Sequence, residues 1–154
     1  MLEILTTLSK LDRVSRHVDP SSFVAAPGIW AAVQTDGSIA NCDSAAVKSL
    51  HKLVIGSKSG NMYEGHDVEV GRITTVESVG ARCKVDGEGY AGTVNQGDLL
   101  CVSYNTVGTS TIGKLVSVDE TAETGTREIV ARAEEIGTDF IVFKTVSPYK
   151  TTLS

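Results

Sequence analysis

Short runs of branched residues, separated by turn-forming residues, dominate the chain between positions 68 and 146. Valine, isoleucine and threonine lose little conformational freedom on a pleated strand, and Gly, Asn and Asp supply the geometry of turns. The pattern predicts strands within residues 68–76, 80–85, 98–104, 113–118, 129–136 and 140–146. Many short strands at near-regular spacing predict an all-β fold, either an antiparallel β-sandwich or a jelly-roll-like barrel.

Polar and apolar side chains alternate most clearly in residues 80–85. Ala81, Cys83 and Val85 project to one face of the predicted strand, whereas Arg82 and Lys84 project to the other. Successive residues of a strand face opposite sides of the sheet, so one side of this sheet is predicted to be buried and the other to face water.

The region between residues 27 and 61 carries shorter signals. Strands are predicted over residues 29–35 and 51–55, and Asp36-Gly37 is a strong hairpin signal because both residues tolerate positive φ. Residues 45–50 are compatible with one or two helical turns, and residues 56–61 with an exposed loop. The single tryptophan, Trp30, stands beside Ala31, Ala32 and Val33, which predicts a place in the core.

The first 26 residues differ from the rest of the chain. Leucines recur at three-residue spacing from Leu2 to Leu11, as on one face of a helix, but Leu2, Ile4 and Leu8 also fit the alternation of a strand. A short helix and an extended arm both remain open, and Asp19-Pro20 ends the segment because the residue before proline avoids the α region. We therefore predict an N-terminal arm or short helix at 1–26, a β domain at 27–148 and a flexible tail at 149–154.

Composition and charge argue against two kinds of partner. Aromatic residues make up 5% of the chain and the formal net charge is -5. A base-stacking platform needs several exposed rings and a phosphate backbone needs a basic surface, so we expect no nucleic-acid partner. No apolar run approaches the roughly 18 residues of a membrane span, and no signal peptide is predicted, so we expect no membrane partner.

Cys42, Cys83 and Cys101 are an odd number of cysteines at wide spacing. A disulfide framework favours an even number, and a zinc site favours C-x-x-C pairs. We therefore expect buried free thiols and a reducing compartment.

No constellation of catalytic residues stands out in the sequence. Residues 54–60 lack the glycine and lysine spacing of a phosphate-binding loop, and His17, His51 and His66 have no H-x-x-x-H or H-x-E partner for a metal. We expect no cofactor, no metal site and no enzymatic activity. A pocket in which His51 or His66 meets a carboxylate or a cysteine would instead favour a small β-barrel enzyme.

A glycine-aspartate pair marks the start of one predicted strand. Gly97-Asp98 allows a sharp turn, after which Leu99, Leu100 and Val102 enter the core. Similar turns occur in small β-barrels that include lipoyl- and biotinyl-carrier domains. A carrier needs its modified lysine at a hairpin tip beside Met, Ala or an acidic residue, and Lys114 lacks these neighbours, so we interpret the motif as barrel architecture.

Several short sequence blocks follow one another in a characteristic order. They are LDRVSR at 11–16, Asp19-Pro20, PGIW at 27–30, GRITTVES at 71–78, GDLL at 97–100, GKL at 113–115 and VARA at 130–133. In this order, over roughly residues 8–146, the chain resembles the small capsid decoration (cement) proteins of tailed bacteriophages. The resemblance implies a β-rich structural virion protein, made in the host cytoplasm, that binds the major capsid protein on the capsid exterior and reinforces contacts between its subunits.

Four residues of the N-terminal segment are the candidate contacts with the capsid: Leu11, Arg13, Arg16 and His17. Arginine is enriched at interfaces because its planar fork pairs bidentately while its stem packs on apolar surface. The alternative is the solvated face of a short helix. Deletion of residues 1–18 is expected to leave the β domain folded and to abolish capsid binding, whereas retained binding would place the interface on the barrel loops.

A closed homo-oligomer is expected, with a homotrimer ahead of a homodimer. A ligand that matches a local symmetry axis of the capsid engages several identical sites, which raises avidity by about 10²–10⁴-fold. The alternatives to a decoration protein are a phage tail-associated or carbohydrate-binding β module without catalysis and, less favoured, a small β-barrel enzyme. Clustered exposed aromatic side chains would favour sugar binding.

Overall fold

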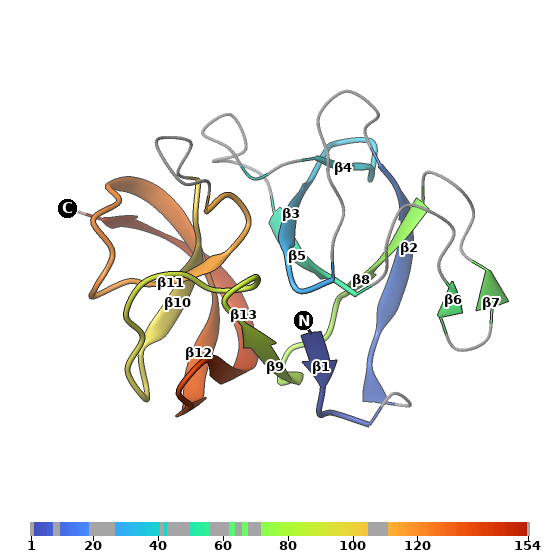
Figure 1. The fold of residues 1–154 in the computed structure, drawn as a ribbon. Coiled ribbons are helices and arrows are strands. Elements are labelled where there is room, and N and C mark those ends of the chain that lie inside the picture. Colours follow the sequence, from blue (N-terminus) through green and yellow to red (C-terminus); the bar gives the residue numbers. More distant parts are fainter. Residues whose placement is uncertain are drawn as a thin grey trace.

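Two antiparallel β-sheets form the body of the protein (Figure 1). The computed structural model describes residues 2–7, 10–18, 27–40, 42, 50–55, 62–63, 66–67, 72–104 and 111–153. Within these residues there are thirteen strands and no α-helix. The predicted all-β, antiparallel fold is confirmed.

The larger sheet has six strands, in the spatial order β1 (Leu2–Ile4), β9 (Arg82–Asp86), β13 (Phe140–Leu153), β12 (Gly125–Ile136), β10 (Leu99–Val102) and β11 (Leu115–Ser117). At its centre, β12 and β13 form a long hairpin. The register of this hairpin shifts after Ile129 and again after Ala133. Such bulges bend and twist a ribbon, so the sheet curves along its length.

The smaller sheet has five strands, in the order β2 (Arg13–His17), β8 (Arg72–Val76), β5 (Leu50–Val54), β3 (Trp30–Val33) and β4 (Ile39–Ala40). An isolated parallel bridge joins Val18, which follows β2, to Ile39 of β4. This bridge brings the two outer strands together, so the sheet curls into a small barrel (Figure 1). A separate hairpin consists of β6 (Met62–Tyr63) and β7 (His66–Asp67).

The N-terminal segment contributes a strand to each sheet. β1 pairs with β9 of the larger sheet, and β2 pairs with β8 of the smaller sheet from Arg13↔Val76 to His17↔Arg72. The described parts of the segment are therefore extended rather than helical. Deleting residues 1–18 would remove both strands and is therefore expected to perturb the fold, whereas the sequence led us to expect an intact β domain.

The structure places most of the predicted flexible tail in a strand. Residues 149–153 belong to β13 and pair with residues 125–129 of β12, and Leu153 is buried. The polar residues Lys150 and Thr152 suggested a mobile end. A strand is held by backbone hydrogen bonds, however, and these cannot be recognised from the side-chain composition of the segment. The correction extends the β domain to Leu153.

An apolar cluster fills the space between the two sheets. Trp30 and Leu53 enter it from the smaller sheet, and Leu100 and Phe143 enter it from the larger sheet. The ring centroids of Trp30 and Phe143 lie 6.4 Å apart. Burial of such side chains is the main stabilising contribution in a fold of this size, and the predicted core position of Trp30 is confirmed.

Strand alternation follows the pattern predicted for residues 80–85. Cys83 and Val85 of β9 are buried, whereas Arg82, Lys84 and Asp86 are partly exposed. The same rule separates neighbouring residues of β3, because Trp30 belongs to the cluster between the sheets and Ala31 to a second cluster on the other face of the smaller sheet.

Two glycines adopt a positive φ in turns that lead into core strands. Gly97, with φ 87°, precedes Asp98, whose carboxylate accepts a hydrogen bond from the Asn95 backbone N–H at 2.9 Å. This is the sharp turn predicted before β10. Gly113, with φ 80°, lies so close to β3 that a Cβ there would stand 2.7 Å from the Trp30 carbonyl oxygen.

Most predicted strands contain an observed one. The segments 29–35, 51–55, 80–85, 98–104 and 113–118 overlap β3, β5, β9, β10 and β11, and 129–136 and 140–146 lie within β12 and β13. The segment 68–76 contains β8, but residues 68–71 lie outside the described residues. The loop at 56–61, Asp19-Pro20 and residues 45–49 of the helical turn predicted at 45–50 lie outside them as well, and Leu50 is the first residue of β5.

Candidate functional site

The predicted capsid contacts lie on or just before β2. Leu11 is buried in the apolar cluster between the sheets, so it stabilises the fold and offers no surface. Arg13 and His17 lie on one face of β2, and Arg16 lies on the other, because strand residues alternate. His17 is exposed and the two arginines are partly exposed, so these three remain as surface candidates.

Arg16 connects three parts of the smaller sheet. Its Nη2 lies 2.7 Å from Glu77 Oε1, its Nε donates to Thr75 Oγ1 at 3.2 Å, and its Nη1 donates to the Gly37 carbonyl oxygen at 3.0 Å. Charge-assisted hydrogen bonds of this kind are stronger than neutral ones. Arg16 therefore fixes the turn between β3 and β4 against β2.

A polar hollow of about 380 Å³ opens where β2 meets this turn. Its lining consists of Ser15, Arg16, His17, Asp36, Gly37 and Ser38, and we call it the β2–turn hollow. Within the turn, the Ser38 N–H donates to Asp36 Oδ1 at 3.0 Å, and Ser38 Oγ lies 2.6 Å from the same oxygen and 2.7 Å from Gln34 Oε1. These hydrogen bonds order the turn that borders the hollow.

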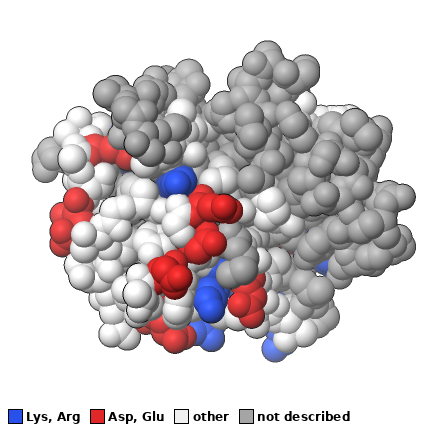
Figure 2. All heavy atoms as spheres, in the orientation of Figure 1, with Lys and Arg blue, Asp and Glu red and all other residues white. Residues whose placement is uncertain are grey.

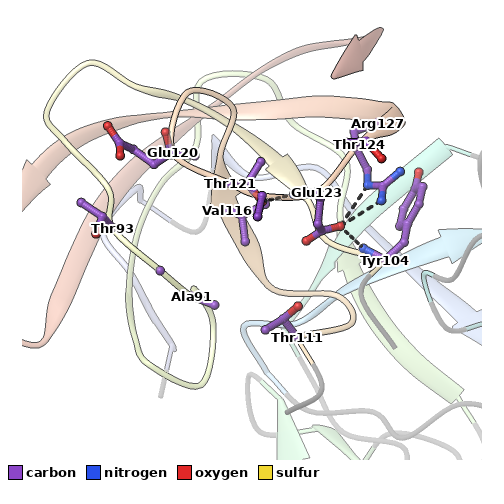
Figure 3. Close-up of a pocket in the computed structure, with 13 residues that line it drawn as sticks. Ala91, Thr93, Tyr104, Thr111, Val116, Glu120, Thr121, Glu123, Thr124 and Arg127 are labelled. Carbon is purple, nitrogen blue, oxygen red and sulfur yellow. Dashed lines mark hydrogen bonds and ion pairs between the residues drawn. The ribbon is translucent and has the colours of Figure 1, made fainter. Parts of the chain in front are cut away.

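A second cavity, of about 510 Å³, opens on the larger sheet between the loop that leads into β12 and the segment before β10 (Figure 3). We call it the Glu123 pocket. Glu123, Arg127 and Tyr104 lie together on one side of it, and Glu120 and Thr93 lie on the opposite side (Figure 3).

Figure 2 shows several groups of acidic side chains, with a few basic ones among them, on the described part of the molecular face that it presents.

Glu123 is held in place by four hydrogen bonds. Its Oε1 accepts from the Tyr104 N–H at 3.1 Å and from Arg127 Nε and Nη2 at 3.1 and 3.0 Å, while its Oε2 accepts from Ser103 Oγ. The Arg127 guanidinium also lies 4.3 Å from the centroid of the Tyr104 ring, which is a cation–π contact. This wall of the pocket is therefore rigid, and the charges of Glu123 and Arg127 compensate each other.

Behind this wall, a buried chain of polar groups joins the two sheets. The Tyr104 hydroxyl lies 3.1 Å from His51 Nε2, and His51 Nδ1 lies 3.5 Å from Glu128 Oε1. The His51 backbone N–H donates to the same Glu128 oxygen at 3.0 Å, and Lys150 Nζ lies 3.1 Å from Glu128 Oε2. Because His51 belongs to β5 and Glu128 to β12, the chain connects the smaller sheet to the larger one.

His51 thus meets a carboxylate, the arrangement that would favour an enzyme, but it does so in the interior. His51 and Glu128 are each 1% exposed, and the adjoining cavity of about 20 Å³ holds no more than a water molecule. Burial raises the pKa of Tyr104 well above its usual value, so its hydroxyl stays protonated. Burial also raises the pKa of Glu128, but the hydrogen bonds and charge of His51, with the bond from Lys150, outweigh it and leave that pKa below its usual value. These buried groups therefore join the two sheets.

The described residues contain no group of three His, Cys, Asp or Glu side chains that could hold a metal ion. All three cysteines are free and buried, as predicted. Burial raises the pKa of the Cys83 and Cys101 thiols to about 12, so neither is a reactive thiolate at neutral pH. The His66 side chain and residues 56–60 of the rejected phosphate loop lie outside the described residues.

No family model, curated protein or solved structure matches this chain. Among the residues that the structure describes, no helix is long and apolar enough to cross a membrane. The surfaces of the chain itself, together with the order of its sequence blocks, are therefore the basis for assigning a function.

The residues of the Glu123 pocket carry no sequence signal that singles them out. Tyr104 and Glu123 are 19 positions apart and are brought together by the tertiary fold, where the Tyr104 N–H donates to Glu123 Oε1. The spacing of four between Glu123 and Arg127 is a pairing signal for helices, and this segment is a loop leading into a strand. His51 and Glu128, 77 positions apart, meet through the packing of two sheets.

Proposed function

We propose that this protein is a structural virion protein that binds the outside of a phage capsid and reinforces the contacts between major capsid protein subunits. The proposal rests on the order of the sequence blocks and on an all-β scaffold tied together at both sheets by its N-terminal strands. The observation that carries it is the β2–turn hollow. There Arg16 and His17, selected for their interface chemistry, meet an ordered hairpin turn at one surface.

A polar hollow beside an ordered turn suits the docking of a loop from a capsid subunit. Binding costs less when the receiving surface is already ordered, and the bonds of Ser38 and Arg16 order this one. His17 and Asp36 place an imidazole and a carboxylate at the hollow. The exposed apolar side chain of Val14 lies on β2, as His17 does. A polar rim beside an apolar contact is the usual composition of an interface.

We further propose that the protein acts as a homotrimer or, failing that, a homodimer. Each hollow is small, so one copy offers a weak contact. Two or three copies on a symmetry axis of the capsid raise the avidity by about 10²–10⁴-fold. Light scattering on the isolated protein tests this part, because a mass of 16.2 kDa would identify a monomer and remove the avidity argument.

The experiment is a binding assay with expanded capsids that lack the protein. Wild-type protein is expected to cosediment with the capsids at micromolar concentration, and Arg13→Glu and His17→Glu are expected to weaken binding by at least about tenfold, the effect of about 1.4 kcal/mol per site. Thermal unfolding of each variant, followed by Trp30 fluorescence, checks that the fold is intact. These substitutions replace the deletion of residues 1–18, which would remove two strands.

Arg132→Glu is the matched control. Arg132 is an exposed arginine on β12 of the larger sheet, away from β2, and its reversal changes the net charge as Arg13→Glu does. It is expected to bind capsids as the wild type does. Equal loss of binding in Arg132→Glu, Arg13→Glu and His17→Glu would show that only total charge matters and would remove β2 and the β2–turn hollow from the proposal.

A further inference from the structure

We propose that the Glu123 pocket is a binding site for a neutral saccharide. The site lies on the larger sheet, whereas the β2–turn hollow lies on the smaller one, so the proposal is independent of capsid binding. It assigns the module a second contact, with a glycan rather than with a protein.

The size of the pocket fits a sugar. Its volume of about 510 Å³ lies within the roughly 300–1,000 Å³ typical of small-molecule sites. One wall is rigid, because Glu123 is fixed by Ser103, Tyr104 and Arg127. A fixed wall distinguishes a binding site from a gap between mobile loops.

Hydroxyl groups that can both donate and accept surround the pocket. Ser103 Oγ donates to Glu123, so its 2.6 Å hydrogen bond with Thr111 is donated by Thr111, whose lone pairs stay available to a ligand. Thr121 Oγ1 accepts from the Glu123 N–H at 3.1 Å and keeps its own proton for donation. Vicinal hydroxyls of a sugar also donate and accept at once, so such a wall complements them.

Two further threonines complete this arrangement at the rim. Thr93 and Thr124 are exposed, and within the described part of the chain their hydroxyls make no hydrogen bond. Thr93 lies on one side of the pocket, and Thr124 lies beside Arg127 on the other (Figure 3). A ligand that spans the pocket can therefore reach hydroxyls from both sides.

The charged side chains that line the pocket favour a neutral ligand over an anion. Arg127 is bound to Glu123, so its positive charge is compensated, and Glu120 adds a further carboxylate to the lining. Phosphates, nucleotides and acidic sugars would meet net negative charge. Ala91 and Val116 supply a small apolar surface for the C–H face of a sugar ring.

The surroundings of the Tyr104 ring determine how tightly the pocket is expected to bind a sugar. Arg127 covers its ring at 4.3 Å, and the His51 ring lies 5.5 Å away from it, centroid to centroid. The ring is therefore occupied and does not stack on a ligand. Without that contribution the dissociation constant for a single sugar is expected in the millimolar range, about 3–4 kcal/mol.

The test is an NMR titration of isotope-labelled full-length protein with glucose, galactose, mannose, N-acetylglucosamine, maltose and lactose, each to about 20 mM. At least one sugar is expected to shift the amide signals of Gly92, Thr121 and Glu123 in a saturable way. Glucose 6-phosphate and galacturonate, the anionic probes, are expected to bind at least about fivefold more weakly. No saturable shift at these amides with any neutral sugar, or stronger binding of an anionic probe, would overturn the proposal.

Variants separate the pocket from the rest of the surface. Thr93→Val and Thr124→Val each remove one rim hydroxyl that has no partner inside the described chain, and each is expected to weaken the best sugar by about three- to tenfold. Thr138→Val changes an exposed threonine in the turn between β12 and β13 and is the matched control, expected to bind as the wild type does. Unchanged binding in both rim variants would refute the site. Capsid binding is measured separately, and neither result decides the other.

Discussion

Glu128 lies between the two sheets and is bonded to a residue of each. Its Oε1 accepts from the His51 backbone N–H of the smaller sheet, and its Oε2 lies 3.1 Å from Lys150 Nζ of the larger sheet. It is 1% exposed, so its charge depends on these partners. Removing one member of a buried pair leaves the other without compensation, which costs far more than breaking a pair on the surface.

Glu128→Ala is expected to lower the free energy of unfolding by about 3–5 kcal/mol. The measurement is urea unfolding followed by the fluorescence of Trp30, the only tryptophan and a core residue. Glu134→Ala is the control, because it removes a carboxylate from a pair with Arg82 that is partly exposed, whereas Glu128 is buried. That control is expected to leave the stability nearly unchanged, and equal losses in the two variants would show that Glu128 has no special role.

The pH dependence of stability should carry the signature of Glu128. Its pKa in the folded protein lies below the unfolded value of about 4.3, so its contribution is present above that value and is lost as the pH falls through the folded pKa. Glu128→Gln does not titrate. The difference in unfolding free energy between the wild type and Glu128→Gln is therefore expected to be largest above about pH 5 and to shrink towards about pH 3. Urea midpoints across this range measure it, and a difference independent of pH would contradict the assignment.

Among the structural elements, the turn before β11 positions the larger sheet on the smaller one. The Gly113 carbonyl accepts a hydrogen bond from the Trp30 N–H at 2.8 Å, and its backbone adopts φ 80°. A Cβ at this position would stand 2.5 Å from Ile29 Cγ2 and 2.7 Å from the Trp30 carbonyl oxygen. Both conformation and space therefore require glycine here.

Gly113→Ala is expected to reduce the free energy of unfolding by about 2–4 kcal/mol, since a positive φ and a steric clash add together. Gly97→Ala separates the two causes, because Gly97 has φ 87° but nothing within 4 Å of its Cβ position. It is expected to cost about 1 kcal/mol. Chemical denaturation of both variants gives the comparison, and equal costs would show that the close approach to β3 is unimportant.

The end of β13 is a second element with a measurable contribution. Leu153 is buried in a cluster with Cys101, Val116 and Ile129. Leu153→Ala is expected to lower the free energy of unfolding by about 2–4 kcal/mol, whereas Leu50→Ala, at a site 55% exposed, is expected to change it by less than about 0.5 kcal/mol. Thermal unfolding distinguishes them. A stable Leu153→Ala variant would restore the flexible tail predicted from sequence.

Sequence patterns predicted most of the strands because the alternation of apolar and polar residues is visible within each strand. The alternation of Cys83 and Val85 with Arg82 and Lys84 requires only neighbours in the chain. The strands near the two ends of the chain were harder to predict from the sequence. Arg13–His17 and residues 149–153 are mostly polar segments, and they form strands because they pair with β8 and β12. The Glu123 pocket was not predictable, since Tyr104, Glu123 and His51 meet only after both sheets have packed.

As a whole, the molecule is two curved sheets around a shared core, with its N-terminal strands bonded to both. The β2–turn hollow and the Glu123 pocket lie on different sheets, so two partners can be engaged at once.

Calorimetry of expanded capsids, with and without added protein, tests the proposed function most directly. A ligand that binds the assembled shell and not the dissociated subunits raises the melting temperature of the shell by mass action. The wild-type protein is expected to bind to saturation at micromolar concentration and to raise that temperature, and Arg132→Glu is expected to do the same. Capsids that neither bind the protein nor melt at a higher temperature in its presence would contradict the assignment as a decoration protein.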